Sequence, residues 1–329
     1  MNTIEQITIK KKIYDDDDMN SRLELNVKGK DIDHVVINTI RRVCLTDIPI
    51  YIFNKFHFVE NTSIFNNNYI KLRFRNIPVI GINAETPFYK KTKQDENNED
   101  NFMENLMNID DINLKTDYNL ESTNLKQLTL YLDYQNKTNT IVTVGTDDCK
   151  FYYQEKEIQS PYKINIPLIK LQENQSIKLT AISEIGIEKN DALYSPVSVL
   201  YFIKNKDNDF DLIAESRGQL DEYQIFDYGI DNIVNQLNIL KLDINEKKIP
   251  DDKKNTIVLE DYNHTMGNLL SQGLRRHSEV IFAGYDMPHI LDDKIHIRFE
   301  IKSDNIKNIM NDVIEYYKNV FTKIKSNLK

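Results

Sequence analysis

The chain contains few of the residues that mark disulfide-rich, zinc-binding or membrane proteins. Its 329 residues include two cysteines, Cys44 and Cys149, and no tryptophan. Because no Cys-x-x-Cys pair occurs, we expect neither a disulfide framework nor a structural zinc site, and a reducing compartment is favoured. No apolar run approaches the ~18 residues of a membrane-spanning helix. The polar start "MNTIEQITIKKK" is unlike a signal peptide. These features predict an intracellular protein.

Motifs of catalysis and of phosphate binding are also missing. The sequence has no Gly-x-Ser-x-Gly and no Gly-x-x-x-x-Gly-Lys. His264, His277, His289 and His296 lack the spacing of three or four residues that brings two metal ligands onto one helix face. Paired carboxylates occur in solvated runs such as "DDDD" at 15–18. We therefore expect no catalytic residue, no metal and no cofactor.

The charge balance is acidic, with 51 Asp and Glu against 42 Lys and Arg and a formal net charge of −9. Nucleic-acid binding by a whole protein needs a basic face, so this balance argues against it. The charge balance does not rule out a local basic patch. The alternative function is a free-standing nucleic-acid-binding protein whose arginine pairs contact phosphates.

Apolar periodicity predicts an α+β fold with a β-rich insertion. Strand and helix patterns in 1–54 and 176–245 predict one discontinuous α+β domain. Short strand-like runs in 55–175 predict the insertion, and its acidic stretch 90–117 predicts a flexible loop. The charged stretch 246–255 is typical of a linker. A second α+β domain follows in 256–329, where the pattern is strand, helix, two strands and a long helix.

The two α+β domains share a local pattern. "DHVVINTIRR" and "NHTMGNLLSQGLRR" both place His and Asn four residues apart, and an arginine pair follows each. Matched surroundings at both ends of the chain indicate two related domains. The simplest arrangement is a pseudo-two-fold pair in which the apolar stripe of each terminal helix is buried against the other domain. The residues expected at this interface within the chain are Met266, Leu269, Leu270, Phe282, Tyr285, Val313, Tyr317, Phe226 and Ile230.

Three glycines indicate close packing in the second domain. Gly267 and Gly273 lie inside an otherwise good helix, where each costs about 1 kcal/mol relative to alanine. Either another group approaches the backbone closely there or the helix bends. Gly284 lies in the middle of a predicted strand, which suggests a bulge or a close backbone crossing.

At these residues the sequence resembles a known family. "DYNHTMGNLLSQGLRRHSEVIFAGYDMPHILDDKIHIRFE" closely resembles the small L-type subunit of archaeal and eukaryotic RNA polymerases. "INTIRRVCLTDIPIYIF" and "VENTSIFNNNYIKLRFRNIPVIG" resemble the larger D-type partner, which is akin to the N-terminal domain of bacterial α. The resemblance implies that both α+β domains are α-like dimerisation domains. Cellular D- and L-type subunits are separate chains. A fused D/L chain resembles the version carried by large cytoplasmic DNA viruses, which would place it in the host cytoplasm (the viral factory) and in the virion.

The resemblance implies a non-catalytic subunit that serves as an assembly platform for a multisubunit DNA-directed RNA polymerase. In that role the chain would dock the two large catalytic subunits and a small polymerase subunit. It would meet DNA and RNA only through the complex, form no homo-oligomer and need no membrane. The residues that the resemblance implies for docking of a large subunit are Asn38, Arg41, Arg42, Glu60, Asn61, Arg73, Arg75 and Pro78.

Overall fold

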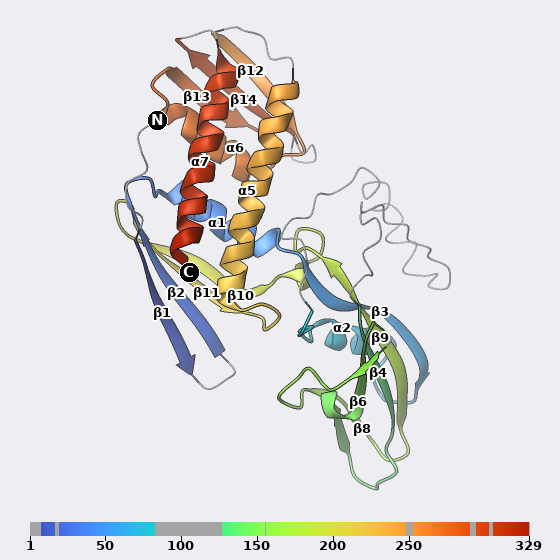
Figure 1. The fold of residues 1–329 in the computed structure, drawn as a ribbon. Coiled ribbons are helices and arrows are strands. Elements are labelled where there is room, and N and C mark those ends of the chain that lie inside the picture. Colours follow the sequence, from blue (N-terminus) through green and yellow to red (C-terminus); the bar gives the residue numbers. More distant parts are fainter. Residues whose placement is uncertain are drawn as a thin grey trace. The chain divides into compact units, whose positions relative to one another are not determined.

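A computed structural model describes residues 8–16, 20–82, 127–154, 156–247, 253–289, 294–302 and 305–328 (Figure 1). They form two compact units, here called unit 1 and unit 2. Unit 1 contains the described residues up to Ile52 and from Ile185 onward, and unit 2 contains those from Phe53 to Glu184. The divisions expected from the sequence lie after residues 54 and 175. The predicted acidic loop at 90–117 lies outside the described residues.

Unit 1 begins with a four-stranded antiparallel sheet. Its strands follow the order β1 (Thr8–Asp16), β2 (Asn20–Lys28), β11 (Asp209–Ser216) and β10 (Val197–Lys206). On β2 the alternating side chains of Leu23, Leu25 and Val27 are buried, as the period of a half-exposed strand requires. The helices of this module are α1 (His34–Thr46) and α5 (Glu222–Glu246). A short 3-10 helix at Ala192–Tyr194 precedes β10. We call this set of elements the first module.

The second module of unit 1 has a three-stranded antiparallel sheet in the order β12 (Lys254–Glu260), β14 (Lys294–Ile301) and β13 (Val280–Asp286). Its helices are α6 (His264–Arg276) and α7 (Ile306–Leu328). In both modules a strand and a helix are followed by two strands and a long helix, and the first strand pairs with the third. β1 is an additional strand of the first module. Both α5 and β12 extend into the stretch 246–255 that was expected to be a linker.

Matching caps start the first helix of each module. The Asp33 carboxylate accepts a hydrogen bond from the Val36 amide at 2.8 Å, and the Asn263 side chain accepts from the amides of Thr265 and Met266. Each cap satisfies amides that have no partner inside the helix. Polar residues at these two positions therefore fix where α1 and α6 begin.

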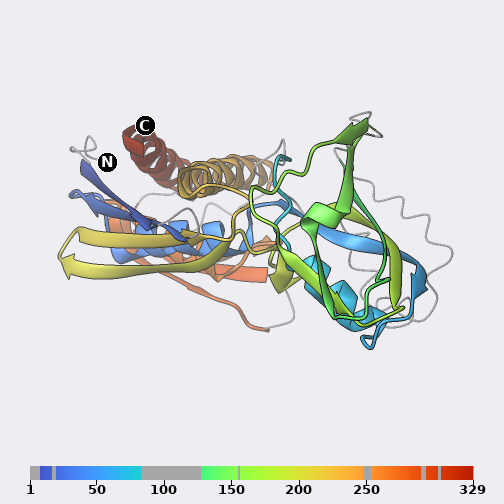
Figure 2. The ribbon, with the colours of Figure 1, turned by 90° about the horizontal axis from the view of Figure 1, so that it is seen from below.

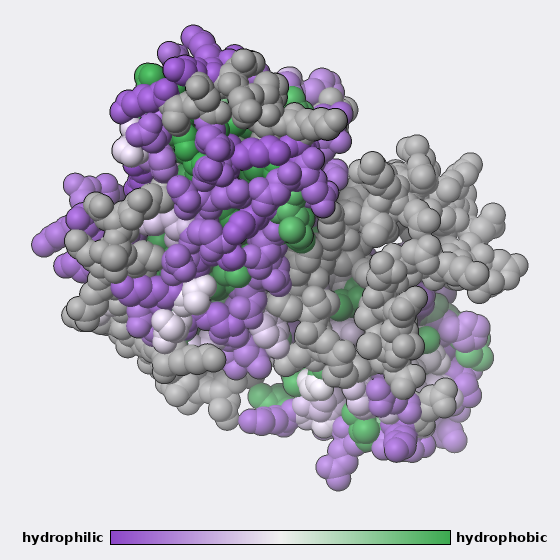
Figure 3. Space-filling view, turned by 45° about the horizontal axis from the view of Figure 1, so that its top comes forward, coloured by the Kyte–Doolittle hydropathy of each residue, from purple (hydrophilic) through white to green (hydrophobic). Residues whose placement is uncertain are grey.

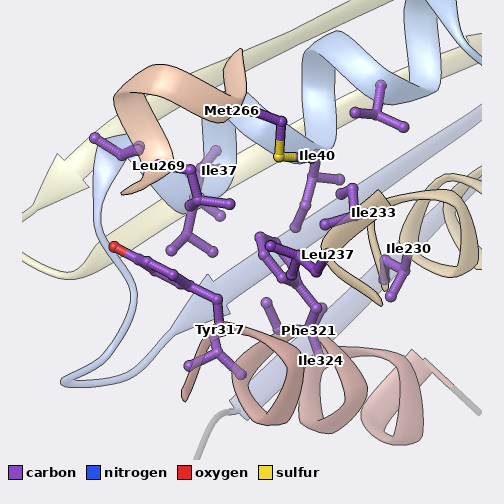
Figure 4. Close-up of a cluster of buried hydrophobic side chains, with 14 of the residues drawn as sticks. Ile37, Ile40, Ile230, Ile233, Leu237, Met266, Leu269, Tyr317, Phe321 and Ile324 are labelled. Carbon is purple, nitrogen blue, oxygen red and sulfur yellow. The ribbon is translucent and has the colours of Figure 1, made fainter. Parts of the chain in front are cut away.

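The long helices α5 and α7 lie side by side and antiparallel (Figures 1 and 2). Lys241 near the end of α5 pairs with Glu315 of α7, while Lys325 near the end of α7 pairs with Asp227 and Asp231 at the start of α5. Their apolar stripes join one hydrophobic core that also contains α1, α6 and both sheets. Figure 4 shows Ile233 and Leu237 of α5 facing Phe321 and Ile324 of α7.

Unit 2 is mainly β-structure and contains one α-helix among its described residues, α2 (Asn67–Arg75). The helix packs its buried residues Ile70 and Phe74 inward. The strands of unit 2 are β3 (Ile50–Asn61), β4 (Leu128–Gln135), β5 (Val142–Gly145), β6 (Cys149–Tyr153), β7 (Lys156–Ile158), β8 (Pro167–Leu171) and β9 (Ser176–Gly186), with a 3-10 turn at Thr146–Asp148. A five-stranded sheet has the order β3, β9, β4, β6 and β7, and β5 pairs with β8 in a second sheet.

The expected close approach at two glycines of α6 is confirmed. A Cβ added at Gly267 would lie 2.5 Å from the Tyr285 ring. One added at Gly273 would meet a methyl group of Val313 and lie 2.6 Å from the ring of Tyr317, both on α7. The expectation for Gly284 was wrong, because pairing with β14 runs without a shift from Phe282 to Asp286 and the irregularity lies earlier, between Val280 and Phe282. The nearest group to a Cβ at Gly284 is the Phe282 ring at 3.4 Å, an ordinary contact.

The surface of the molecule in Figure 3 is mainly hydrophilic over the upper part, with hydrophobic side chains in small separate patches. Across the described ranges, none of the helices combines the length and hydropathy needed to cross a bilayer.

We expect Gly273→Ala to destabilise the protein by about 1–3 kcal/mol, because the added methyl group would overpack the contact between α6 and α7. The helix propensity of alanine would offset about 1 kcal/mol of that loss. Chemical denaturation followed by circular dichroism measures the change. Gly284→Ala is the matched control and should change the free energy of unfolding by less than about 0.5 kcal/mol. A Gly273→Ala protein more stable than the wild type would contradict the packing described here.

Candidate protein-docking surfaces

The outer side of α1 carries the first predicted docking residues. His34 and Arg42 are exposed, while Asn38 and Arg41 are half-buried. The Arg41 Nε donates a hydrogen bond to Asn38 Oδ1 at 3.0 Å. Partial burial and, secondly, the charge of Arg42 lower the pKa of Arg41. Within the part of the chain that the structure describes, neither arginine pairs with a carboxylate, so α1 presents two uncompensated cations.

α6 presents a similar outer face in the second module. His264, Arg275 and Arg276 are exposed, and Asn268 is half-buried. The Arg275 Nε donates to the Ser271 carbonyl of its own helix at 3.2 Å. We call the outer sides of α1 and α6 the two helix faces.

The two helices contact each other through reciprocal polar contacts at their ends. Arg42 near the end of α1 donates to Thr265 Oγ1 at the start of α6, at 2.7 Å. Arg276 at the end of α6 forms an ion pair with the Asp33 carboxylate, the cap of α1, at 2.6 Å. Asp33 therefore both caps its own helix and binds the neighbouring one. The arginine pairs of the sequence are divided, since Arg42 and Arg276 contact the other module and Arg41 and Arg275 do not.

Between these polar ends the contact of the modules is hydrophobic. Figure 4 shows Met266 of α6 close to Ile40 of α1, and Leu269 close to Ile37. Most residues expected at the interface are almost completely buried in the shared core: Met266, Leu269, Leu270, Val313, Tyr317, Phe226 and Ile230.

The other two expected interface residues are less buried, and Tyr285 packs against the edge of the shared core. The Tyr285 ring packs on Gly267 and against the ring of His264, both in its own module. Phe282 is 55% exposed, so it is not a buried interface residue. It lies on β13, an edge strand, next to the register shift that follows Val280.

The predicted docking residues of unit 2 mostly stabilise unit 2 itself. The Glu60 carboxylate accepts from the Ser176 hydroxyl at 2.5 Å, and the Asn61 amide donates to the Phe65 carbonyl at 2.9 Å. The Arg73 guanidinium donates to the Pro167 carbonyl at 3.0 Å. The Pro78 carbonyl accepts from the Tyr162 hydroxyl at 2.9 Å. Arg75 is half-buried at the end of α2.

The segment between Glu60 and Pro78 also has an apolar surface that was not predicted from the sequence. Ile64, Tyr69 and Leu72 are 67%, 42% and 53% exposed, and Phe65 stacks on Tyr69 with ring centroids 4.7 Å apart. We call these four residues the α2 patch. Ile70 and Phe74 are spaced to face inward, which leaves Tyr69 and Leu72 on the outside. That spacing was the signal from which the patch could have been found.

The described residues contain no group of three or more His, Cys, Asp or Glu that could hold a metal ion. Burial raises the pKa of both thiols, Cys44 and Cys149, which opposes formation of the reactive thiolate. An open depression beside the α2 patch is lined by Asn61, Ser63, Ile64, Phe65 and 66–68, and it contains no charged side chain.

Comparison with known proteins gives a consistent family. Residues 254–327 match the RNA polymerase Rpb3/Rpb11 dimerisation domain. A DNA-directed RNA polymerase subunit of Acanthamoeba polyphaga mimivirus is 26% identical over 89% of this chain and 87% of its own length. The RNA polymerases I and III subunit rpc19 of Dictyostelium discoideum is 30% identical over 23% of this chain and 78% of its own length. The RNA polymerase II subunit rpb11 of the same organism is 39% identical over 18% of this chain and 49% of its length. The chain therefore belongs to the family of Rpb3/Rpb11-type RNA polymerase subunits.

Proposed function

We propose that this chain is a non-catalytic assembly subunit of a multisubunit DNA-directed RNA polymerase and that the two large catalytic subunits dock on it. The observation that carries this proposal is the pair of helix faces held by one hydrophobic core. Each face leaves an arginine, Arg41 or Arg275, without a carboxylate among the described residues. Such cations on a rigid helix suit recognition of acidic side chains or backbone carbonyls of a partner.

The two modules act as a pseudo-two-fold pair in this proposal. Three features support the pairing: the common order of strands and helices, the matching caps at Asp33 and Asn263, and the reciprocal contacts of Arg42 and Arg276. In a self-complementary interface each surface makes the same contacts to its partner that the partner makes to it. Two similar faces in one chain then serve two different large subunits.

Unit 2 supplies a docking surface of a different kind. The α2 patch exposes apolar and aromatic side chains, which act as anchors in protein interfaces when a partner covers them. Arg73 lies on the same exposed side of α2. We infer that the α2 patch binds a hydrophobic element of a large subunit, and that Glu60, Asn61 and Pro78 act by holding the patch in shape.

The division of the chain follows from the same proposal. The first module with unit 2 would correspond to a D-type subunit, residues 256–329 to an L-type subunit, and the stretch between them to a fusion joint. The mimivirus relative, which is similar over most of both chains, supports this fused arrangement. A viral chain of this kind would work in the host cytoplasm and in the virion.

The double substitution Arg41→Glu with Arg42→Glu should weaken binding of a large subunit at least tenfold, about 1.4 kcal/mol or more, because it reverses two charges on one helix face. Co-expression of the tagged chain with the two large polymerase chains, followed by pull-down at several salt concentrations, measures this loss. Leu72→Asp in the α2 patch should produce a separate loss of similar size, since it places a charge among apolar contacts.

The matched control is Arg298→Glu, at a side chain that is 62% exposed on the three-stranded sheet. This control should recover both large chains. Equal recovery with the wild type and all variants would contradict the proposed surfaces. Absence of large chains even with the wild type, together with salt-sensitive DNA binding by the isolated chain, would favour the alternative of a free-standing nucleic-acid-binding protein.

A double-mutant cycle on Asp33 and Arg276 tests the contact between α1 and α6. Asp33→Asn keeps an oxygen that can cap α1 but removes the charge, and Arg276→Gln removes the partner. The coupling energy should be about 0.5–1 kcal/mol, because the Asp33 side of this ion pair is largely shielded from solvent. The coupling should fall at high salt, because the Arg276 side is partly exposed. Denaturation midpoints provide the four free energies.

The same cycle on the exposed pair Lys204–Asp207 is the reference, where coupling near zero is expected. If the coupling of Asp33 with Arg276 were no larger than this reference, the reciprocal contact would have no energetic role in solution.

A further inference from the structure

Strand β10 is the last strand of the four-stranded sheet and pairs only with β11 among the described residues. Among the described residues, no strand pairs with the backbone N–H and C=O groups along its outer edge. Natural proteins usually protect such edges with charged side chains, proline, β-bulges, a covering segment or a short strand length. β10 has ten residues and no proline, and its lysines and register shifts lie toward its two ends, which leaves Val199 to Ile203 without these protections.

The side chains on the outer face of β10 are apolar. Val199, Tyr201 and Ile203 alternate along the strand and are 37%, 38% and 49% exposed. We call these three residues the β10 row. On the other face of the strand, Val197 and Leu200 are buried in the shared core. The β10 row is therefore an exposed stripe of a strand whose inner face is already used.

The neighbouring strands carry polar groups on this outer face. Opposite Ile203, Asp211 of β11 accepts a hydrogen bond from Asn26 of β2 at 2.7 Å. Opposite Val199, Glu215 lies 4.0 Å from Arg22. Between these polar positions, Ile213 of β11 lies opposite Tyr201 and is 2% exposed. The middle of the β10 row therefore adjoins a buried apolar side chain, and its two ends adjoin polar ones.

We propose that β10 accepts an extended segment of another polymerase subunit as an additional strand of this sheet. The backbone of the segment would pair with the free edge, and its alternate apolar side chains would pack on the β10 row. The proposal rests on the proposed function only for the source of the segment. It adds a binding surface separate from the helix faces and the α2 patch.

Charge indicates the chemistry of the segment. The ten residues of β10 include Lys204, which pairs with Asp207 at 2.8 Å, and Lys206, and they include no acidic residue. A complementary strand would therefore place Asp or Glu opposite Lys206 and apolar residues opposite the row. A second copy of β10 provides no carboxylate for Lys206, and the net charge of −9 on each chain opposes self-association. These two facts favour a different polypeptide over a second copy.

Amide hydrogen exchange of the isolated chain and of the assembled polymerase tests this proposal directly. In the isolated chain, the β10 amides that point away from β11 should exchange fast. In the polymerase the same amides should exchange at least tenfold more slowly, because an added strand accepts their hydrogen bonds. Unchanged exchange of β10 in an assembled polymerase would overturn the proposal while leaving the proposed function intact.

A pair of variants separates strand addition from general burial. Tyr201→Lys with Ile203→Lys places charges on the edge and should abolish the added protection, whereas both large subunits remain bound through the helix faces. Ile158→Lys, on the short strand β7 of unit 2, is the control and should leave β10 protected. Protection of β10 in the isolated chain that rises with concentration, together with a dimer in sedimentation, would show that a second copy occupies the edge and would refute the proposal. A chain that joins no polymerase would refute it together with the proposed function.

Discussion

Burial of the apolar stripe on α7 is the constraint on which unit 1 depends. Ten residues of this helix are buried, and they face α5 and α6 together, not a sheet of their own module alone. Each large apolar side chain removed from water contributes about 1.5–3 kcal/mol. The ion pairs between α5 and α7 are partly exposed, and such pairs contribute about 0–1 kcal/mol each. Hydrophobic burial therefore holds the modules together, and the ion pairs select the alignment of the helices.

This shared core has a consequence for function. A protein that docks large partners must keep its binding side chains in fixed relative positions, since any freedom lost on binding weakens the complex. Here the buried sides of α1 and α6 pack in the shared core, and their ends are joined by the Asp33–Arg276 and Arg42–Thr265 contacts. Close packing at Gly267 and Gly273 removes space for movement of α6. The rigid arrangement leaves the outer sides of both helices exposed, as the proposed docking of partners requires.

Much of unit 1 follows from local patterns in the sequence. Helical spacing of apolar residues and polar caps predicts α1, α6 and the long terminal helices, because both signals depend only on residues within a few turns. The close approach at Gly273 was also predictable, since glycine within a buried helix face is costly unless space is needed. Phe282 was misjudged for a physical reason: its exposure depends on the position of β13 at the edge of a sheet, which no local period encodes.

The docking residues of unit 2 illustrate a different limit. The resemblance directed attention to polar residues such as Glu60, Asn61 and Arg73, and these make hydrogen bonds within unit 2. Apolar side chains such as Ile64 and Leu72 were passed over, because an isolated hydrophobic residue in a sequence is usually assumed to be buried. Only the packing of α2 shows which of its faces remains outside. Docking at this segment stays a prediction, and its exposed apolar chemistry could be recognised only from the structure.

The central claim is that one core unites both modules of unit 1, and cleavage of the connection between them tests it most directly. A protease site inserted between residues 247 and 253 of the full chain would allow cutting under native conditions, followed by size-exclusion chromatography with mass detection. The account predicts that the two pieces stay together as a one-to-one complex that separates only on unfolding. Dissociation of the pieces into two folded monomers would contradict it.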